Sequence, residues 1–287
     1  MSALRWQRNA LGFEIHDGER LVTLYRANEE LPRKESPKPC FAPIYTPSGK
    51  LITEYRPADH AWHTGLYFGW VHVNDANLWG GPWFLPETGK YQLLENSHGV
   101  QRHDAFLQER VDDAGVFVRE KLTWLDPKDR PMVAETRAYT FHKPSDDAYL
   151  WTVETEIQPV VEKVTMGSSQ APARYSGFEL RMGPPFADAA HRCSEGRIGH
   201  ENIMHQKARW VSAAGAAGGA VVMMDHPQNP RHPVTWFTRK NLLGAGLLME
   251  GILELKRDET LRLRYGLAIL NREPSVAEIE TLYEQFI

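Results

Sequence analysis

Apolar and polar residues alternate along much of this chain, which is the period of a β-strand with one buried face. The alternation is clearest over 261–269, where one face would carry Leu261, Leu263, Tyr265, Leu267 and Ile269. The opposite face would carry Arg262 and Arg264. The same period recurs over 116–124, 133–142 and 150–157, and turn-forming residues separate these segments. We therefore predict antiparallel strands, each with one face exposed to water.

The two ends of the chain give the sharpest local predictions. Segments 13–16 and 21–25 look like strands and flank Asp17-Gly18, which is a hairpin turn sequence. Near the other end, Ser275 and Glu278 match a capping box, and apolar residues follow at helical spacing. No other segment predicts a helix as clearly. The expected fold is all-β: a large antiparallel β-sandwich of about fifteen or more strands with a short C-terminal helix.

Composition narrows the class of protein further. No repeat or linker divides the sequence, so we expect a single domain over 1–287. With 42% hydrophobic residues, 24% charged residues and a net charge of -4, the chain has no bulk attraction for nucleic acid. Its apolar segments are too short to cross a bilayer, so no membrane association is expected. Two cysteines, Cys40 and Cys193, and a start without an apolar leader favour a cytoplasmic location.

Candidate chemistry is concentrated in 59–84, which contains four of the nine tryptophans and three of the twelve histidines. Pro57 before His60 and His63, and a glycine-rich and aromatic strand pattern after them, predict a loop that enters a strand. Imidazole titrates near neutrality, so the pair could transfer protons or form part of a metal site. Alternatively, both rings bond backbone carbonyls and hold the loop. Trp62 lies between them and could stack on a sugar ring.

A second segment, 225–237, presents polar side chains on a stiff backbone. Three prolines restrict the chain around Asn229, Arg231 and His232, and Trp236 follows them. This segment is either a rigid turn between two strands or a binding loop. In the second interpretation His232 would be catalytic, and Asn229, Arg231 and Trp236 would bind substrate.

A third segment, 175–184, places two opposite charges on one strand. Glu179 and Arg181 would share a face, with Phe178 and Leu180 on the other face. Burying an unpaired charge costs several kcal/mol, so Glu179 and Arg181 either pair with each other or line a cavity. In a cavity, Glu179 would be a candidate base and Arg181 a stabiliser of developing negative charge.

The chain resembles the bacterial domain family catalogued as "methane oxygenase PmoA". The resemblance covers nearly the whole chain and depends on Pro43-Ile44-Tyr45-Thr46-Pro47-Ser48-Gly49, on 59–70 (DHAWHTGLYFGW) and on 229–233 (NPRHP). It implies a supersandwich of the galactose-mutarotase kind and an uncharacterised function, often encoded among bacterial sugar-catabolic genes. Methane oxidation is not implied, because the genuine monooxygenase subunit is an integral membrane protein and this chain has no spanning segment.

The resemblance also implies a set of site residues, namely Tyr45, Asp59, His60, His63, Asn229, Arg231 and His232. Many members read DHPHHRG where this chain reads DHAWHTG, so Trp62 and Thr64 depart from the pattern. The missing histidine weakens any metal site that needs three ligands from this loop. Tyr45, Asp59 and Trp62 are expected to bind substrate.

Together these residues predict a carbohydrate-active enzyme that acts on a sugar or keto-sugar derivative by general acid/base proton transfer. His60 or His63 would exchange protons with Glu179, and Trp62 or Trp236 would form the platform for the sugar. One alternative is a carbohydrate-binding protein without chemistry. Another is a metal-dependent lyase or oxygenase, with His60 and His63 as ligands and His98, His232 or Glu179 completing the shell.

The sequence leaves cofactor, substrate and assembly open. It contains no dinucleotide-binding, Walker A, nucleophile-elbow or zinc-protease motif. Large antiparallel sheets have edges that must be covered, and a homo-oligomer is one way to cover them, although no residue selects it. A small-molecule sugar is the expected partner.

Overall fold

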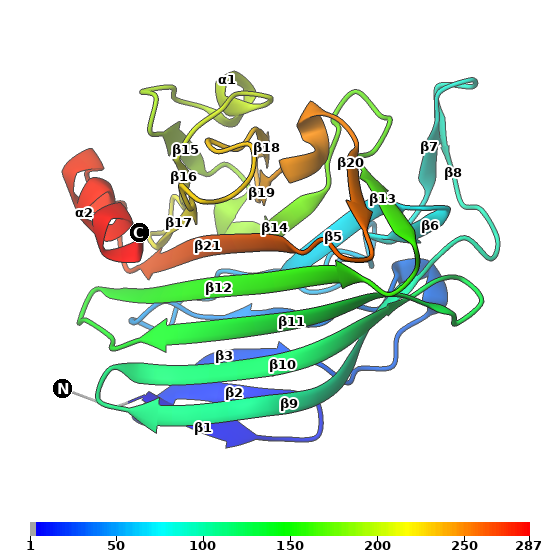
Figure 1. Ribbon diagram of the computed structural model, residues 1–287. Coiled ribbons are helices and arrows are strands. Elements are labelled where there is room, and N and C mark those ends of the chain that lie inside the picture. The colour runs from blue at the N-terminus through cyan, green and yellow to red at the C-terminus, as the bar shows by residue number, and fades with distance from the viewer. Residues whose placement is uncertain (1–3) are drawn as a thin grey trace.

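Two large antiparallel sheets face each other in the computed structural model, which describes residues 4–287 (Figure 1). The smaller sheet has eight strands, in the order β15 (Ala190–Cys193), β16 (Trp210–Ala214), β17 (Ala220–Asp225), β21 (Leu261–Leu270), β12 (Ala148–Pro159), β11 (Pro131–His142), β10 (Gly115–Leu125) and β9 (Val100–Asp112). The alternating segments of the sequence therefore became its long central strands, as predicted.

The larger sheet has eleven strands. Its main path runs β1 (Leu4–Arg8), β2 (Gly12–Asp17), β3 (Arg20–Arg26), β4 (Cys40–Ile44), β5 (Leu66–Val73), β14 (Gly177–Arg181), β19 (Leu242–Ala245) and β18 (Trp236–Arg239). Beside this path, β5 also pairs with β6 (Ala76–Leu78) and with β13 (Lys163–Gly167), which pairs with β20 (Leu253–Lys256). A separate hairpin joins β7 (Trp83–Leu85) and β8 (Lys90–Gln92). The expected hairpin at Asp17-Gly18 is confirmed as β2 and β3.

Helices are few and short. The predicted C-terminal helix is confirmed as α2 (Val276–Phe286), and both bonds of the capping box between Ser275 and Glu278 are present. The four-residue helix α1 (His200–Ile203) was not predicted, because one turn leaves no periodic pattern in a sequence. Three 3-10 turns complete the set: η1 (Arg33–Glu35), η2 (Pro184–Phe186) and η3 (Leu247–Glu250). No helix within 4–287 has the length and apolar character needed to cross a membrane.

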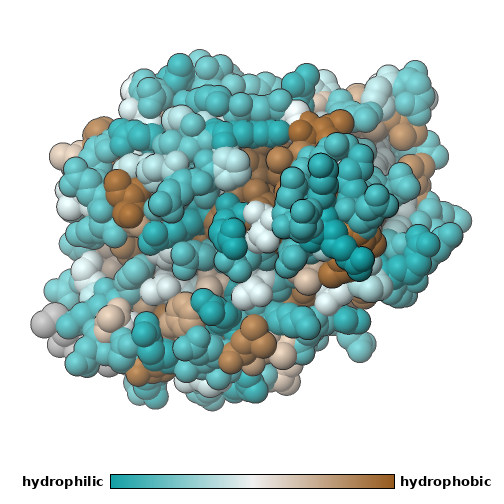
Figure 2. Space-filling view, in the orientation of Figure 1, coloured by the Kyte–Doolittle hydropathy of each residue, from teal (hydrophilic) through white to brown (hydrophobic). Residues whose placement is uncertain are grey.

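The main core lies between the two sheets. The larger sheet contributes residues such as Phe68, Phe178 and Leu180, and the smaller sheet residues such as Tyr139 and Leu267. On the outer face of the smaller sheet, α2 covers a second apolar cluster through Ile279, Tyr283 and Phe286. In the view of Figure 2, hydrophilic residues cover most of the molecular face and apolar residues appear in separate patches. The predicted all-β sandwich is therefore confirmed.

A third apolar cluster lies on the outer face of the larger sheet. Successive residues of a strand point to opposite faces, so Tyr67 and Phe237 project away from the main core while Phe68 and Trp236 project into it. The third cluster also contains Trp79 from the loop after β6. It forms the floor of the pocket described next.

Candidate functional site

A pocket of about 410 Å³ opens on the outer face of the larger sheet. It brings together two histidines, two arginines and several aromatic rings from segments far apart in the sequence. The lining residues are His60, Trp62, His63, Trp79, Pro82, Tyr91, Ala173, Tyr175, Arg181, Phe237, Arg239 and Leu242. Small-molecule sites are commonly concave, roughly 300–1000 Å³ in size and mostly apolar with a few convergent polar groups. This pocket has that character.

The register of the larger sheet positions one wall of the pocket. Leu242 of β19 pairs with Arg181 on β14 and with Arg239 on β18, so the three residues form one row across three strands. Residues directly opposite each other in a sheet point to the same face. The two arginine side chains therefore flank Leu242 on the pocket side, as the lining shows.

The histidines come from the loop that precedes β5, as predicted. The His60 amide donates to the Pro57 carbonyl at 3.0 Å, and the His63 amide donates to the His60 carbonyl at 2.9 Å. These are successive tight turns, not a helix, and they place the two imidazole rings face to face with centroids 5.1 Å apart. The side chain of Asp59 lies 2.9 Å from His60 Nδ1, at ion-pair distance but without the alignment of a hydrogen bond, and is 70% exposed.

His63 has no hydrogen-bond partner within the described residues. Its side chain is only 4% exposed, yet neither Nδ1 nor Nε2 bonds to any protein group. The Trp79 ring meets it edge-on at 5.1 Å. Burial, followed by the positive charge of Arg181, lowers the pKa of His63 well below its usual value. The ring is therefore neutral near pH 7, and neither of its nitrogens is engaged by a protein group.

Glycines bring the two tryptophans of the pocket close to the backbone. A Cβ atom added to Gly69 would lie only 2.2 Å from the nearest atom of the Trp79 indole. The Trp62 ring covers Gly81 in the same way, at 2.5 Å. Any larger residue at either glycine would displace a ring. The glycine and tryptophan richness of 59–84 thus has a structural cause.

A buried lysine holds these loops together. The Nζ atom of Lys38 donates to the Trp79 carbonyl at 2.8 Å and to the Trp62 carbonyl at 3.1 Å, and it contacts the carbonyls of Ser36 and Glu35 more distantly. Burial lowers the pKa of Lys38 to about 8. No sequence pattern indicates this role, since a single lysine in a proline-rich segment has no distinguishing neighbours.

Glu179 and Arg181 share a face, as predicted, but they do not pair with each other. Arg181 Nε donates to Glu54 Oε2 at 3.1 Å. Glu179 accepts hydrogen bonds from Trp79 Nε1 at 2.8 Å and from the Tyr67 hydroxyl at 3.1 Å. Arg181 lines the pocket, whereas Glu179 does not, because Trp79 lies over it. Neither predicted alternative holds for Glu179, which bonds Trp79 and Tyr67 and does not line the pocket.

Burial raises the pKa of Glu179 to about 7. Between the ordinary value of 4.5 and pH 7 the folded protein retains a proton that the unfolded chain has lost, so this residue makes the fold less stable as pH rises through that window. We expect Glu179→Gln to remove this dependence. Its free energy of unfolding, measured by urea denaturation, should rise relative to wild type from about pH 5 to pH 7 and then level off. A difference that does not change with pH would contradict the assignment.

The second polar segment has a structural role and does not line the pocket. Asp225 is fully buried, and it accepts bonds from Asn229 Nδ2 at 2.7 Å and the Val234 amide at 2.9 Å, with His232 Nδ1 2.7 Å away. Arg231 binds the carbonyls of Leu247, Gly251 and Ile252. The sequence allowed either a rigid turn or a binding loop here, and these contacts are those of a rigid turn.

Three further predicted residues also lie away from the pocket. Trp236 is buried in the main core, where Nε1 donates to the Ala208 carbonyl at 2.8 Å, so it cannot form a platform for this pocket. Its neighbour Phe237 lines the pocket instead, because successive residues of a strand point to opposite faces of the sheet. Tyr45 follows β4, pairs with Leu51 across an isolated bridge and is not part of the lining. His98 Nε2 lies 2.7 Å from the Gly81 carbonyl.

The metal ligand set considered from the sequence does not assemble. His98 is engaged with Gly81, His232 lies beside Asp225 and Glu179 is covered by Trp79. Across residues 4–287, no three side chains of His, Cys, Asp or Glu gather in a way that would hold a metal ion. His60 and His63 thus face the pocket as a pair.

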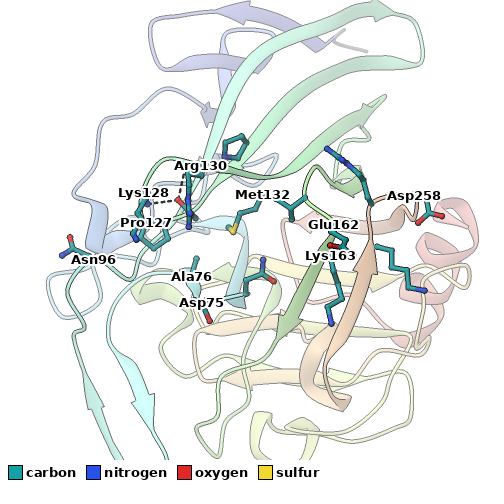
Figure 3. A pocket seen from close by; sticks show the side chains of 16 residues that line it. Asp75, Ala76, Asn96, Pro127, Lys128, Arg130, Met132, Glu162, Lys163 and Asp258 are labelled. Carbon is teal, nitrogen blue, oxygen red and sulfur yellow. Dashed lines mark hydrogen bonds and ion pairs between the residues drawn. The ribbon is translucent and has the colours of Figure 1, made fainter.

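A larger groove of about 1150 Å³ is a weaker candidate (Figure 3). Its charged side chains come from separate turns and strand ends, and Figure 3 shows Asp75, Lys128, Lys163 and Asp258 around an open space. The lining contains acids and bases but no histidine and no aromatic residue. It therefore lacks both the imidazoles and the stacking surfaces found in the smaller pocket.

Sequence reasoning missed four pocket residues that matter: Trp79 as a wall, Tyr175, Phe237 and Arg239. Trp79 lay within the dense segment and could have been singled out with Trp62. Phe237 and Arg239 alternate on β18, so the same two-residue period would have shown that they share a face. Which face became the pocket depends on the covering loops, and no local pattern gives that.

The fold and the pocket define a large antiparallel β-sandwich protein with an aromatic, basic site on the outer face of one sheet. A family model described as "Family of unknown function (DUF6807)" matches residues 13–284, and the chain belongs to this family. No curated protein matches the chain. The resemblance to the family catalogued as "methane oxygenase PmoA" stays a prediction.

Solved structures show only distant likeness. One is named "Putative kojibiose phosphorylase from human microbiome"; it has 9% identity and a TM-score of 0.34, and the match covers 92% of this chain. This chain spans only 28% of the length of that protein. Another, from "Crystal Structure Analysis of HI1317", has 9% identity and a TM-score of 0.32, and the match covers 94% of this chain and 99% of that one. Likeness at this level does not extend either protein's activity to this chain.

Proposed function

We propose that the pocket binds a sugar or keto-sugar derivative and that His63 and His60 transfer protons at a carbon next to its carbonyl group. The observation that carries the proposal is His63, a buried imidazole with two unpartnered nitrogens inside an aromatic pocket. Buried polar groups are nearly always bonded, so two orphaned nitrogens beside a cavity point to a partner that the protein alone does not supply. The implied association of the resembling family with sugar catabolism also supports this substrate class.

The arrangement suits abstraction of a proton from carbon. Neutral His63 accepts the proton, the electron pair of the broken C–H bond moves onto the carbonyl oxygen, and the positive charge that the arginines give the pocket favours this negative oxygen. His60, which stacks on His63 and is partly open to solvent, can return a proton to the same carbon, and the carbonyl then reforms to give the epimer. Alternatively, the proton of the neighbouring hydroxyl moves to the enolate oxygen and His60 protonates the former carbonyl carbon, which gives the isomer. Neither outcome changes the overall oxidation state of the sugar. Trp62 and Phe237 supply flat surfaces for the sugar ring.

Solvent exchange tests this proposal directly, because it detects proton transfer whatever product is formed. The protein is incubated in D₂O with a panel of aldoses, ketoses and keto-glycosides, and deuterium at the carbon next to the carbonyl is followed by NMR. We expect at least one substrate to exchange faster than in protein-free buffer. Saturable binding with no exchange at any pH would indicate a carbohydrate-binding protein without chemistry. Absence of both binding and exchange would overturn the assignment to carbohydrate.

The location and assembly of the protein stay predictions. Cys40 and Cys193 are both buried and unpaired. We propose a cytoplasmic location, because two cysteines cannot form a disulfide framework of the kind that secreted proteins use. A homo-oligomer would be tested by light scattering of the purified protein.

A further inference from the structure

We infer that the ligand of this pocket is an anionic sugar, a sugar acid whose carboxylate is bound between Arg181 and Arg239. The inference deepens the proposed function and depends on it, because it assumes that the pocket binds a sugar. It goes further by naming the charged group that the sugar carries and the residues that select it.

The charge of the lining carries the argument. Two arginines and two histidines face the pocket, and none of the lining residues is an aspartate or glutamate. The nearest acids are otherwise placed: Glu179 lies beneath Trp79, Glu54 pairs with Arg181, and Asp59 projects beside His60 with its side chain largely exposed. A pocket for neutral sugars would be expected to offer carboxylate acceptors to hydroxyl groups, whereas this one offers donors.

Arg239 is the cation left without a partner. Its guanidinium lies 5.5 Å from the Phe237 ring centroid, and among residues 4–287 no carboxylate comes within ion-pair distance of it. Arg181 is partly neutralised by Glu54 Oε2 at 3.1 Å. The two arginines thus carry close to one unbalanced positive charge, which matches a single carboxylate better than a phosphate dianion.

The sheet register gives the arginines a geometry suited to this group. Both pair with Leu242, so their backbones lie two strand spacings apart, roughly 10 Å. Long side chains from two sides can converge over the leucine between them. Guanidinium groups bind carboxylates through two parallel hydrogen bonds, so they fix the orientation of the ligand as well as its charge. One end of the sugar would then be fixed here, with its ring directed toward the tryptophans and His63.

Calorimetric titration with matched sugars tests the inference. The probes are D-glucose, D-glucuronate and D-glucose 6-phosphate, together with the corresponding galactose series, so members of a series differ only at the terminal carbon. We expect a uronate to bind at least about tenfold tighter than its neutral parent, which is about 1.4 kcal/mol. The preference should shrink when salt is raised from about 0.05 M to 0.5 M, because ionic attraction is screened.

Substitutions test whether Arg239 causes the preference for uronates over neutral sugars. Arg239→Gln should reduce the ratio of uronate to neutral affinity to near one, and Arg239→Lys should retain part of it. Arg110→Gln, an equal charge change at an exposed residue of β9 outside the pocket, should leave the ratio unchanged. Equal binding of uronates and neutral sugars would overturn the inference but leave the proposed function intact. Tighter binding of the 6-phosphates would overturn the carboxylate assignment, and no binding by any probe would count against both proposals.

Discussion

Replacing His63 by glutamine is expected to lower the rate of proton exchange on a responsive sugar by about 10²- to 10⁴-fold, the usual contribution of a general acid or base. Glutamine keeps the polarity of the side chain but cannot accept a proton at neutral pH. Because neither ring nitrogen of His63 bonds to the protein, the substitution breaks no internal hydrogen bond. The melting temperature should therefore stay close to that of wild type.

The control is a histidine whose contacts are structural. His142→Gln removes a ring with a lowered pKa that lies beside Thr152 on the smaller sheet, outside the pocket. Its exchange rate should match wild type. Unchanged exchange in His63→Gln would show that His63 is not the base, while a large drop in melting temperature would show that the ring has a packing role instead.

The pH profile gives a second readout from the same experiment. Burial and neighbouring charge lower the pKa of His63 well below 6.5, and the base must be neutral to accept a proton. Activity should therefore persist as the pH falls to 6.5 and be lost only below it. The residual exchange of His63→Gln should lack that acid limb.

Much of the fold could be predicted because strand alternation is a local property. Segment 261–269 shows this most clearly: each residue assigned to the inner face, such as Leu263 or Leu267, lies in the main core. The C-terminal helix was equally readable, since Ser275 and Glu278 identify its start without reference to the rest of the chain. Strand alternation and helix capping each depend on residues that are close together in the chain, so both can be recognised from the sequence alone.

The site could be predicted only in part, because a polar side chain does not reveal its partner. The shared face of Glu179 and Arg181 followed from the strand period, but their partners Trp79 and Glu54 come from other segments. The dense polar turn at 225–233 looked like a binding loop because it is stiff. The stiff turn instead holds hydrogen-bond donors against the Asp225 carboxylate, which tertiary packing buries.

The alternation also conceals a pair of opposite charges in the core. On β11 the inward positions include Glu135 and Arg137, and both side chains are almost completely buried. Arg137 Nε donates to Glu135 Oε1 at 2.6 Å, and its Nη2 donates to Glu135 Oε2 at 2.9 Å. Trp124 Nε1 and the Thr155 hydroxyl complete the coordination of this carboxylate. Their polarity alone would assign both residues to the wet face, whereas the two-residue period places them on the same face as Val133 and Tyr139.

This buried pair gives the largest expected effect on stability. Arg137→Met leaves Glu135 buried without its counter-charge, and breaking such a pair typically costs about 4 kcal/mol. We expect urea denaturation at pH 7 to show a loss of that size. The double variant Glu135→Gln/Arg137→Met should recover part of the loss, because no unpaired charge then remains in the core.

An exposed ion pair on the same sheet provides the matched control. Arg262 Nε lies 3.0 Å from Glu156 Oε1, with side chains 69% and 57% exposed. Surface pairs contribute at most about 1 kcal/mol, so Arg262→Met should change stability by no more than that. If Arg137→Met and Arg262→Met cost the same, or if the double variant is no more stable than Arg137→Met, then uncompensated charge is not what the Arg137 side chain prevents. In the second case the packing of Arg137 against the Phe68 ring, whose centroid lies 4.7 Å from the guanidinium carbon, would be the source of the stability.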